Sequence, residues 1–280
     1  MCARDPAELQ AILQPLPLKA WMAVQTTLLT PHPGGAGRHP VTGKVVVITG
    51  ASRGIGAGLV AAYRGRGWAV VATARTIKPS RDPDLLAVAG DIADPMTVGR
   101  ITGAALDRFG RIDTLVNNAG VYLSKPFTDY TAADYTTVVG VNLAGFFWLT
   151  QAAIAEMASR YGGHVVNVMA TLAEVADSST PTVLAALTRG GLAAATRSLA
   201  IEYAAYGIRV NAVSPGIVAT PVHPAESYEQ LGGRLPPLGR VGQVSDVVDG
   251  VLFLESSPYI TGEILHIDGG QITGHAGPYG

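Results

Sequence analysis

The chain has 280 residues, 48% hydrophobic and only 15% charged, which excludes a disordered chain and provides ample apolar surface for a core. Its 20 basic and 21 acidic residues give a formal net charge of −1, so nothing in its charge points to nucleic acid or to a membrane surface. The single cysteine, Cys2, excludes intrachain disulfides and a metal-thiolate site. We therefore expect a cytoplasmic protein without a metal.

Residues 1–41 differ in composition from the rest of the chain. The first ten residues carry both charge signs and a proline, unlike a secretory signal, and residues 30–40 (TPHPGGAGRHP) are typical of a connector. We predict a loosely ordered extension over 1–41, one domain over 42–272 and a short tail over 273–280.

Apolar runs and glycine stops predict alternating strands and helices along that domain. The first run, KVVVITG, is β-branched and ends in glycine, as a buried strand does. In chain order we predict strand 44–50, helix 54–67, strands 68–75 and 85–91, helix 96–110, strand 112–120, helix 131–160, strand 163–170, helix 183–206, and strands 208–216 and 263–270. This order predicts an α/β fold, a Rossmann-type doubly wound parallel sheet with helices on both faces, in a single domain.

The run at 138–155 has no charged residue and is just long enough to suggest a membrane span. It contains Asn142, Thr150 and Gln151, and ordinary polar sequence flanks it. We therefore expect no membrane contact but a helix buried on most sides, with another subunit as a candidate cover.

A glycine-rich turn, TGASRGIG (49–56), separates the first strand from the first helix. Glycines at this point let the backbone turn sharply and approach a pyrophosphate, whose charge is stabilised at the helix N-terminus. The position between a strand and a helix indicates a dinucleotide site rather than a chance turn. The predicted contacts from this turn are Gly50, Ser52, Arg53, Gly54, Ile55 and Gly56.

The spacing of these glycines and five further motifs resemble the short-chain dehydrogenase/reductase family over about residues 42–272. In order, the other motifs are GDIAD (90–94), NNAG (117–120), Asn142, IRVNAVSPG (208–216) and a final DGG. The resemblance implies a nicotinamide cofactor, a small-molecule substrate, a homotetramer or homodimer, and a substrate lid at about 217–243. It also implies cofactor contacts by Asp91 and Ile92 at the adenine, by Asn118, Ala119 and Gly120 at the ribose, and by Pro215, Gly216, Ile217 and Thr220 at the nicotinamide end.

The charge near the end of the second strand favours NADP(H) over NAD(H). An NAD enzyme usually has a carboxylate there to bind the adenosine ribose, whereas this chain has Ala74 and Arg75. With Arg53 in the glycine turn, two guanidinium groups could pair with a 2′-phosphate. The alternative is that one of these arginines is only a solvated surface residue.

The helix at 183–206 lacks the family's acid. Family members use a tyrosine as the proton donor and a lysine four residues later, which binds the nicotinamide ribose and lowers the tyrosine pKa. Here those positions fall on Ala185 and Arg189, and there is no tyrosine between Tyr161 and Tyr203. Arginine can still bind ribose hydroxyls but stays protonated, so it cannot exchange a proton in a relay.

Two other catalytic positions remain as candidates. The family's serine position falls on Ala170 or Thr171, and Thr171 has a hydroxyl, although a strand-end threonine often bonds only to backbone. Asn142 matches the family's asparagine, although a buried helix could use it structurally. Candidate replacement acids, each with a surface or packing role as the alternative, are Tyr122, residues 177–180, His223, Glu226 and Tyr228.

Three functions are consistent with this sequence. The first is an NADP(H)-dependent oxidoreductase acting on a carbonyl or alcohol of a small, fairly apolar molecule, with a relocated or substrate-supplied proton donor. The second is a non-redox enzyme in the same cleft. The third is a non-catalytic cofactor-binding or assembly subunit, because a fold does not fix a function.

Overall fold

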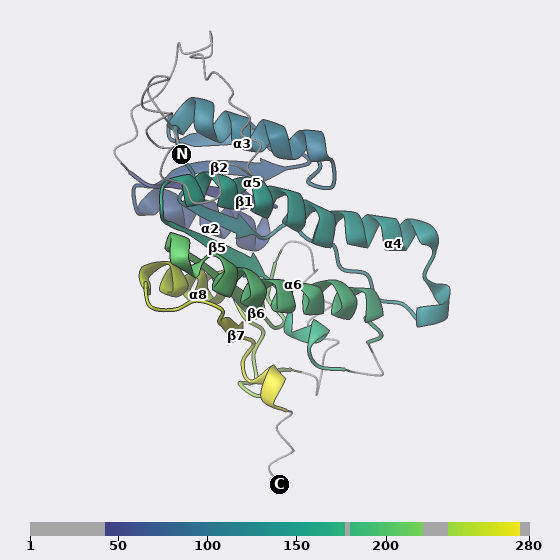
Figure 1. The fold of residues 1–280 in the computed structure, drawn as a ribbon. Helices are drawn as coiled ribbons and strands as arrows, with labels where there is room; N and C mark the ends of the chain where they lie inside the picture. Colours follow the sequence, from purple (N-terminus) through teal and green to yellow (C-terminus); the bar gives the residue numbers. More distant parts are fainter. Residues whose placement is uncertain (1–42, 177–179, 221–234, 275–280) are drawn as a thin grey trace, which may run out of the picture. The chain divides into compact units, whose positions relative to one another are not determined.

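The computed structural model describes residues 43–176, 180–220 and 235–274, and the predicted extension over 1–41 lies outside them. A seven-stranded sheet runs through this part of the chain in the order β3-β2-β1-β4-β5-β6-β7 (Figure 1). Every neighbouring pair is parallel. The strand order reverses between β1 and β4, which confirms the predicted doubly wound sheet.

The strands agree with the predicted ranges to within a few residues. They are β1 (Val45–Thr49), β2 (Ala69–Ala74), β3 (Leu85–Ala89), β4 (Thr114–Asn117), β5 (Gly163–Val168), β6 (Ile208–Pro215) and β7 (Ile264–Ile267). The α-helices are α2 (Gly54–Gly65), α3 (Pro95–Phe109), α4 (Ala132–Val139), α5 (Gly145–Ser159), α6 (Val183–Glu202) and α8 (Val244–Ser256). Short 3-10 helices follow three strands and one helix: η2 (Phe127–Asp129) after β4, η4 (Thr171–Ala173) after β5, η5 (Ala204–Tyr206) after α6 and η7 (Gln271–Thr273) after β7.

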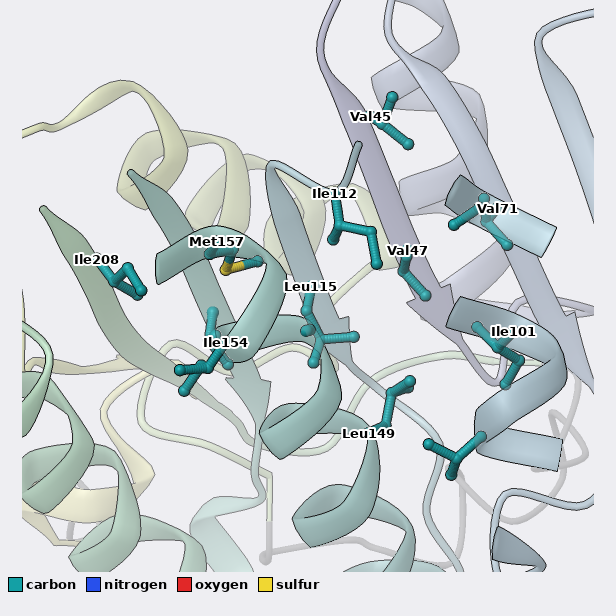
Figure 2. Close-up of a cluster of buried hydrophobic side chains, with 14 of the residues drawn as sticks. Val45, Val47, Val71, Ile101, Ile112, Leu115, Leu149, Ile154, Met157 and Ile208 are labelled. Atoms are coloured by element: carbon teal, nitrogen blue, oxygen red, sulfur yellow. The ribbon is translucent and has the colours of Figure 1, made fainter. Parts of the chain in front are cut away.

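Helices cover both faces of the sheet because its strands are apolar on both sides. Val45 and Val47 of β1 face a cluster formed with α3 and α5, whereas Val46 and Ile48 face one formed with α2 and α8. Figure 2 shows the first cluster, in which α5 directs Leu149 and other side chains at the strands. Burial of this kind contributes about 25 cal/mol per Å² of apolar surface, so the two clusters fix the sheet that positions the site.

The predicted helix at 131–160 is three segments in the structure. A π-helical turn, η3 (Gly140–Ala144), separates α4 from α5. By length and composition, Ala132–Ser159 is the one described helix that could cross a membrane, yet its α5 end packs in the core through Leu149 and Met157. Only 39% of its apolar window is buried within the chain, less than the predicted burial on most sides, because Phe147 and Trp148 are exposed.

Helix α8 was not among the predicted elements. At its start the Asp246 carboxylate accepts a hydrogen bond from the Gln243 N–H at 2.8 Å, and Val247, Val251 and Leu254 are fully buried. The apolar spacing of three and four residues was therefore present in the sequence as a signal for this helix.

Candidate functional site

The glycine turn joins β1 to α2 at the carboxyl edge of the sheet. Gly50 and Gly54 both have positive φ angles, of 64° and 55°, which suits glycine. A side chain at Gly56 would collide with the carbonyl oxygen of Gly50. Arg53 caps α2 without a side-chain hydrogen bond, and no acidic residue lies in the first turn. The N–H groups at this helix end are thus available to an anion such as a pyrophosphate.

The NNAG loop is clamped to this turn by Thr49, which the sequence reasoning had not singled out as a functional residue. The Thr49 hydroxyl accepts hydrogen bonds from the backbone N–H groups of Asn118 (3.0 Å) and Ala119 (2.8 Å). The Asn118 amide in turn donates to the Thr49 carbonyl at 2.9 Å. Thr49 precedes the glycine turn directly, so its place in the motif was the available signal. These bonds hold the predicted phosphate and ribose contacts together.

The two residues predicted to lie beside the adenine differ in exposure to solvent. Asp91 is exposed and accepts a hydrogen bond from the backbone of Ala93 at 3.0 Å, whereas Ile92 is buried against Gly145. Arg53 and Arg75 are both exposed, Arg53 at the start of α2 and Arg75 directly after β2. Both arginines therefore belong to the carboxyl edge of the sheet, Arg53 in the turn after β1 and Arg75 directly after β2.

The predicted nicotinamide end lies where β6 ends. Pro215 is the last residue of β6, and a side chain at Gly216 would press on Asp268 after β7. Ile217 accepts a hydrogen bond from the N–H of Gly242 at 2.8 Å, which ties the two ends of the predicted lid together. The lid residues 221–234, including His223, Glu226 and Tyr228, lie outside the described residues, as do 177–179.

Thr220 brings the start of the lid to the glycine turn. A side chain built at Gly54 would lie 3.5 Å from the Thr220 methyl group. Thr220 and the turn are therefore adjacent, although they are far apart in the sequence.

In α6, Ala185 is buried and Arg189 is partly buried. Arg189 Nη1 donates to the Val168 carbonyl at the end of β5, at 2.5 Å, and a side chain at Gly120 would collide with Nη2. The structure thus places Arg189 against the NNAG loop, beside the predicted ribose contacts. Burial lowers the pKa of Arg189 to about 10, so the side chain is still charged at neutral pH.

Asn142 lies in the π-helical turn and is buried. Its Oδ1 accepts from the Val121 N–H at 2.9 Å, while its Nδ2 donates to the Val121 carbonyl at 3.0 Å and to Thr188 at 3.2 Å. A single π turn inside a helix often occurs at functional sites. Here it lets Asn142 hold the loop after β4 against α6, with Thr188, another residue that the sequence reasoning had missed.

Thr171 is fully buried, and its hydroxyl is already engaged. Thr171 Oγ1 has the Ser214 carbonyl at 3.1 Å and a carboxylate oxygen of Asp268 at 3.3 Å. A hydroxyl has one proton, and both of these groups are acceptors. Thr171 can donate its proton to a substrate only after it gives up its hydrogen bond to Ser214 or Asp268.

The remaining candidate groups are few within the described residues. Tyr122 is 47% exposed, and its partial burial raises the pKa of its hydroxyl, which makes it a weaker proton donor. No group of three or more metal-binding side chains occurs in the described part of the chain. A pocket beneath the NNAG loop is lined by Thr49, Ile92, Asn117, Ala119, Val141, Asn142, Gly145, Phe146, Arg189 and Leu192.

The chain is similar to known proteins over most of its length. The sequence profile of a family described as enoyl-(acyl carrier protein) reductase matches residues 50–271. The 3-oxoacyl-[acyl-carrier-protein] reductase FabG of Vibrio cholerae is 32% identical over 239 residues, which cover 82% of this chain and 97% of the relative. An uncharacterized oxidoreductase of Methylorubrum extorquens is 36% identical over 245 residues, with 81% and 97% covered. The solved structure of ElxO with NADP bound matches with a TM-score of 0.75 at 28% identity, over 83% of this chain and 100% of that one.

Proposed function

Because this chain belongs to the short-chain dehydrogenase/reductase family, we propose that it is an NADP(H)-dependent oxidoreductase acting on a carbonyl or alcohol group. The observation that carries the proposal is the uncapped N-terminus of α2 behind a turn that admits no side chain at Gly56. This arrangement fits a pyrophosphate. When bound, the nicotinamide cofactor supplies or accepts the hydride.

The choice of NADP(H) rests on the charges beside the turn. Arg53 and Arg75 are exposed near the carboxyl edge, and β2 ends in Ala74 with no carboxylate to receive ribose hydroxyls. Two arginines suit the 2′-phosphate of NADP(H), which distinguishes it from NAD(H). The relative ElxO is a protein solved with NADP bound, which supports the same choice.

We propose that the site is atypical, with Ala185 and Arg189 at the positions of the family's tyrosine and lysine. Arg189 would then bind the nicotinamide ribose, Asn142 would hold the loop beside it, and Thr171 would stand in for the family's serine. A positioned general acid usually contributes about 10²–10⁴-fold, so carbonyl reduction without one should be slow unless the substrate or another group supplies the proton.

Two further parts of the proposal concern the surroundings of the protein. We propose a cytoplasmic homo-oligomer, a dimer or tetramer, that takes a small and mainly apolar substrate. Exposed apolar side chains on α5 and α6 support the assembly, namely Phe147 and Trp148 on α5 and Leu187 on α6. Replacing Trp148 with glutamate should then shift the elution of the protein in size-exclusion chromatography toward a smaller species, and an unchanged elution would argue against this face.

The test of the activity is cofactor absorbance with a panel of ketones, aldehydes and quinones. We expect slow oxidation of NADPH by some members, and the double variant Ala185→Tyr with Arg189→Lys should raise the rate. Cofactor binding without turnover of any carbonyl would favour a non-redox enzyme or a cofactor-binding subunit instead. Failure of the double variant to gain activity would show that the pocket does not keep the family's geometry.

A further inference from the structure

Arg189 carries a partly enclosed charge for which the described residues provide no counterion. Burial lowers its pKa to about 10, and no charge among the described residues raises it again. Its one hydrogen bond to the described residues is with a neutral carbonyl, that of Val168. Charges removed from water are usually paired, because an unpaired one loses its hydration without compensation. The charge of Arg189 therefore has no anionic partner among the described residues.

The walls around the guanidinium group are neutral. Of the ten residues that line the pocket beneath the NNAG loop, Arg189 alone is charged, and Ile92, Val141, Phe146 and Leu192 are apolar. The two asparagines there are committed elsewhere. Asn117 donates to Thr150 and Asn167, and Asn142 bonds Val121 and Thr188. No lining residue competes for the arginine.

The guanidinium group is also held in one orientation. Nη1 is fixed to the end of β5 through Val168, and Nη2 lies directly against Gly120, where no side chain could fit. A guanidinium group has five N–H donors in a rigid fork, of which the Val168 carbonyl takes one. The remaining N–H donors have no hydrogen-bond partner among the described residues.

We infer that Arg189 binds a carboxylate of the substrate, so that the substrate class is a small carbonyl compound or alcohol whose otherwise apolar body carries one carboxylate group. The inference rests on the proposed oxidoreductase function and adds to it, because the ribose hydroxyls that Arg189 would bind there are neutral and leave the charge unpaired. A carboxylate matches the planar fork and one positive charge. A phosphate dianion would bring a second negative charge, and the described lining has no second cation for it.

Acetate and its neutral isostere acetamide test this directly on the full chain, by saturation-transfer NMR at constant ionic strength. We expect acetate to bind the wild type and to bind Arg189→Met at least tenfold more weakly, with acetamide weak on both. Arg197→Met is the matched control, because Arg197 is an exposed arginine on the same helix and its loss should leave acetate binding unchanged. Equal acetate binding to wild type and Arg189→Met, or acetamide binding as tight as acetate, would overturn the inference.

Arg189→Lys keeps the charge and guards against a folding defect in the methionine variant, which circular dichroism would reveal. We expect it to bind acetate more weakly than the wild type but more tightly than Arg189→Met, because it keeps the charge and loses the fork. A folded lysine variant that binds acetate no better than the methionine variant would contradict pairing of the charge with a carboxylate. Inorganic phosphate binding more tightly than acetate, in an Arg189-dependent manner, would overturn the assignment of a carboxylate.

Failure of carboxylate binding and failure of the proposed oxidoreductase function can be told apart. NADPH titrated against the same samples reports the cofactor site, so failure to bind NADPH would remove the oxidoreductase function while the acetate result stood. If turnover is found, pyruvate should be reduced with a higher kcat/KM than acetone by the wild type, and Arg189→Met should abolish that preference. An equal preference in both proteins would contradict a substrate carboxylate at Arg189.

Discussion

A buried carboxylate at the edge of the sheet opposite the candidate site offers a sharp test of the packing. Glu255, at the end of α8, has a side chain only 7% exposed, and its Oε2 accepts from Tyr63 Oη (3.1 Å), Thr114 Oγ1 (3.0 Å) and His164 Nδ1 (3.1 Å). Asn211 donates to His164 Nε2, so the imidazole is neutral with its proton on Nδ1. These bonds join α8 and α2 to the strands.

Replacing Glu255 with leucine leaves three buried donors without their acceptor. An unsatisfied buried group costs about 1–3 kcal/mol, and removing one partner of a buried pair costs about 3–5 kcal/mol. We expect the free energy of unfolding to fall by about 3–5 kcal/mol. At about 2–4 °C per kcal/mol for chains near this size, Tm should fall by about 6–20 °C.

Urea unfolding followed by circular dichroism measures this change. Glu255→Gln keeps one acceptor oxygen and should lose less, and Glu263→Leu, at an exposed glutamate near β7, should stay within about 0.5 kcal/mol. A Glu255→Leu variant as stable as the wild type would refute the network as a contributor to stability.

Three further predictions concern pH and the cofactor. Burial lowers the pKa of His164 below its ordinary value and outweighs the opposite effect of Glu255, so the contribution of the neutral imidazole to stability is complete above about pH 6.5 and is lost as the pH falls further. His164→Asn should therefore flatten the dependence of the unfolding free energy on pH between about pH 6.5 and 5, and an unchanged slope would contradict this. Arg75→Glu should weaken NADPH binding at least tenfold by calorimetry and NADH binding much less, while Arg66→Glu, at the far end of α2, should change neither; an equal loss for both cofactors would refute the phosphate contact. Gly56→Ala should also weaken NADPH binding at least tenfold, because its side chain must displace the Gly50 carbonyl, and retained affinity would show that the turn does not hold the pyrophosphate.

The regular parts of the fold were predictable because their signals are local. The run KVVVITG marks β1 by its β-branched residues and the stop at Gly50, and β1 indeed spans Val45–Thr49. Helix α8 could have been found from the apolar spacing of Val247, Val251 and Leu254, which the predicted elements left out. The π turn at Gly140–Ala144 has no comparable sequence signal, since it forms where Asn142 reaches across to another loop.

The site was predictable in its motifs and not in its contacts. The glycine turn and the NNAG loop are adjacent, as the family resemblance implied, but the hydroxyl of Thr49 that joins them was missed. The pairing of His164 with Glu255 spans 91 residues, a separation over which sequence spacing carries no information. The enclosure of Arg189 likewise depends on three elements that meet only in the fold. The roles assigned to Arg189 and Thr171 stay predictions.

The binding of NADP(H) at the carboxyl edge of the sheet is the central claim, and calorimetric titration of the full chain with NADPH and then NADH tests it most directly. We expect one NADPH site per chain and an affinity for NADPH at least tenfold above that for NADH, because Arg53 and Arg75 would pair with the 2′-phosphate. No binding of either cofactor, or a preference for NADH, would contradict it.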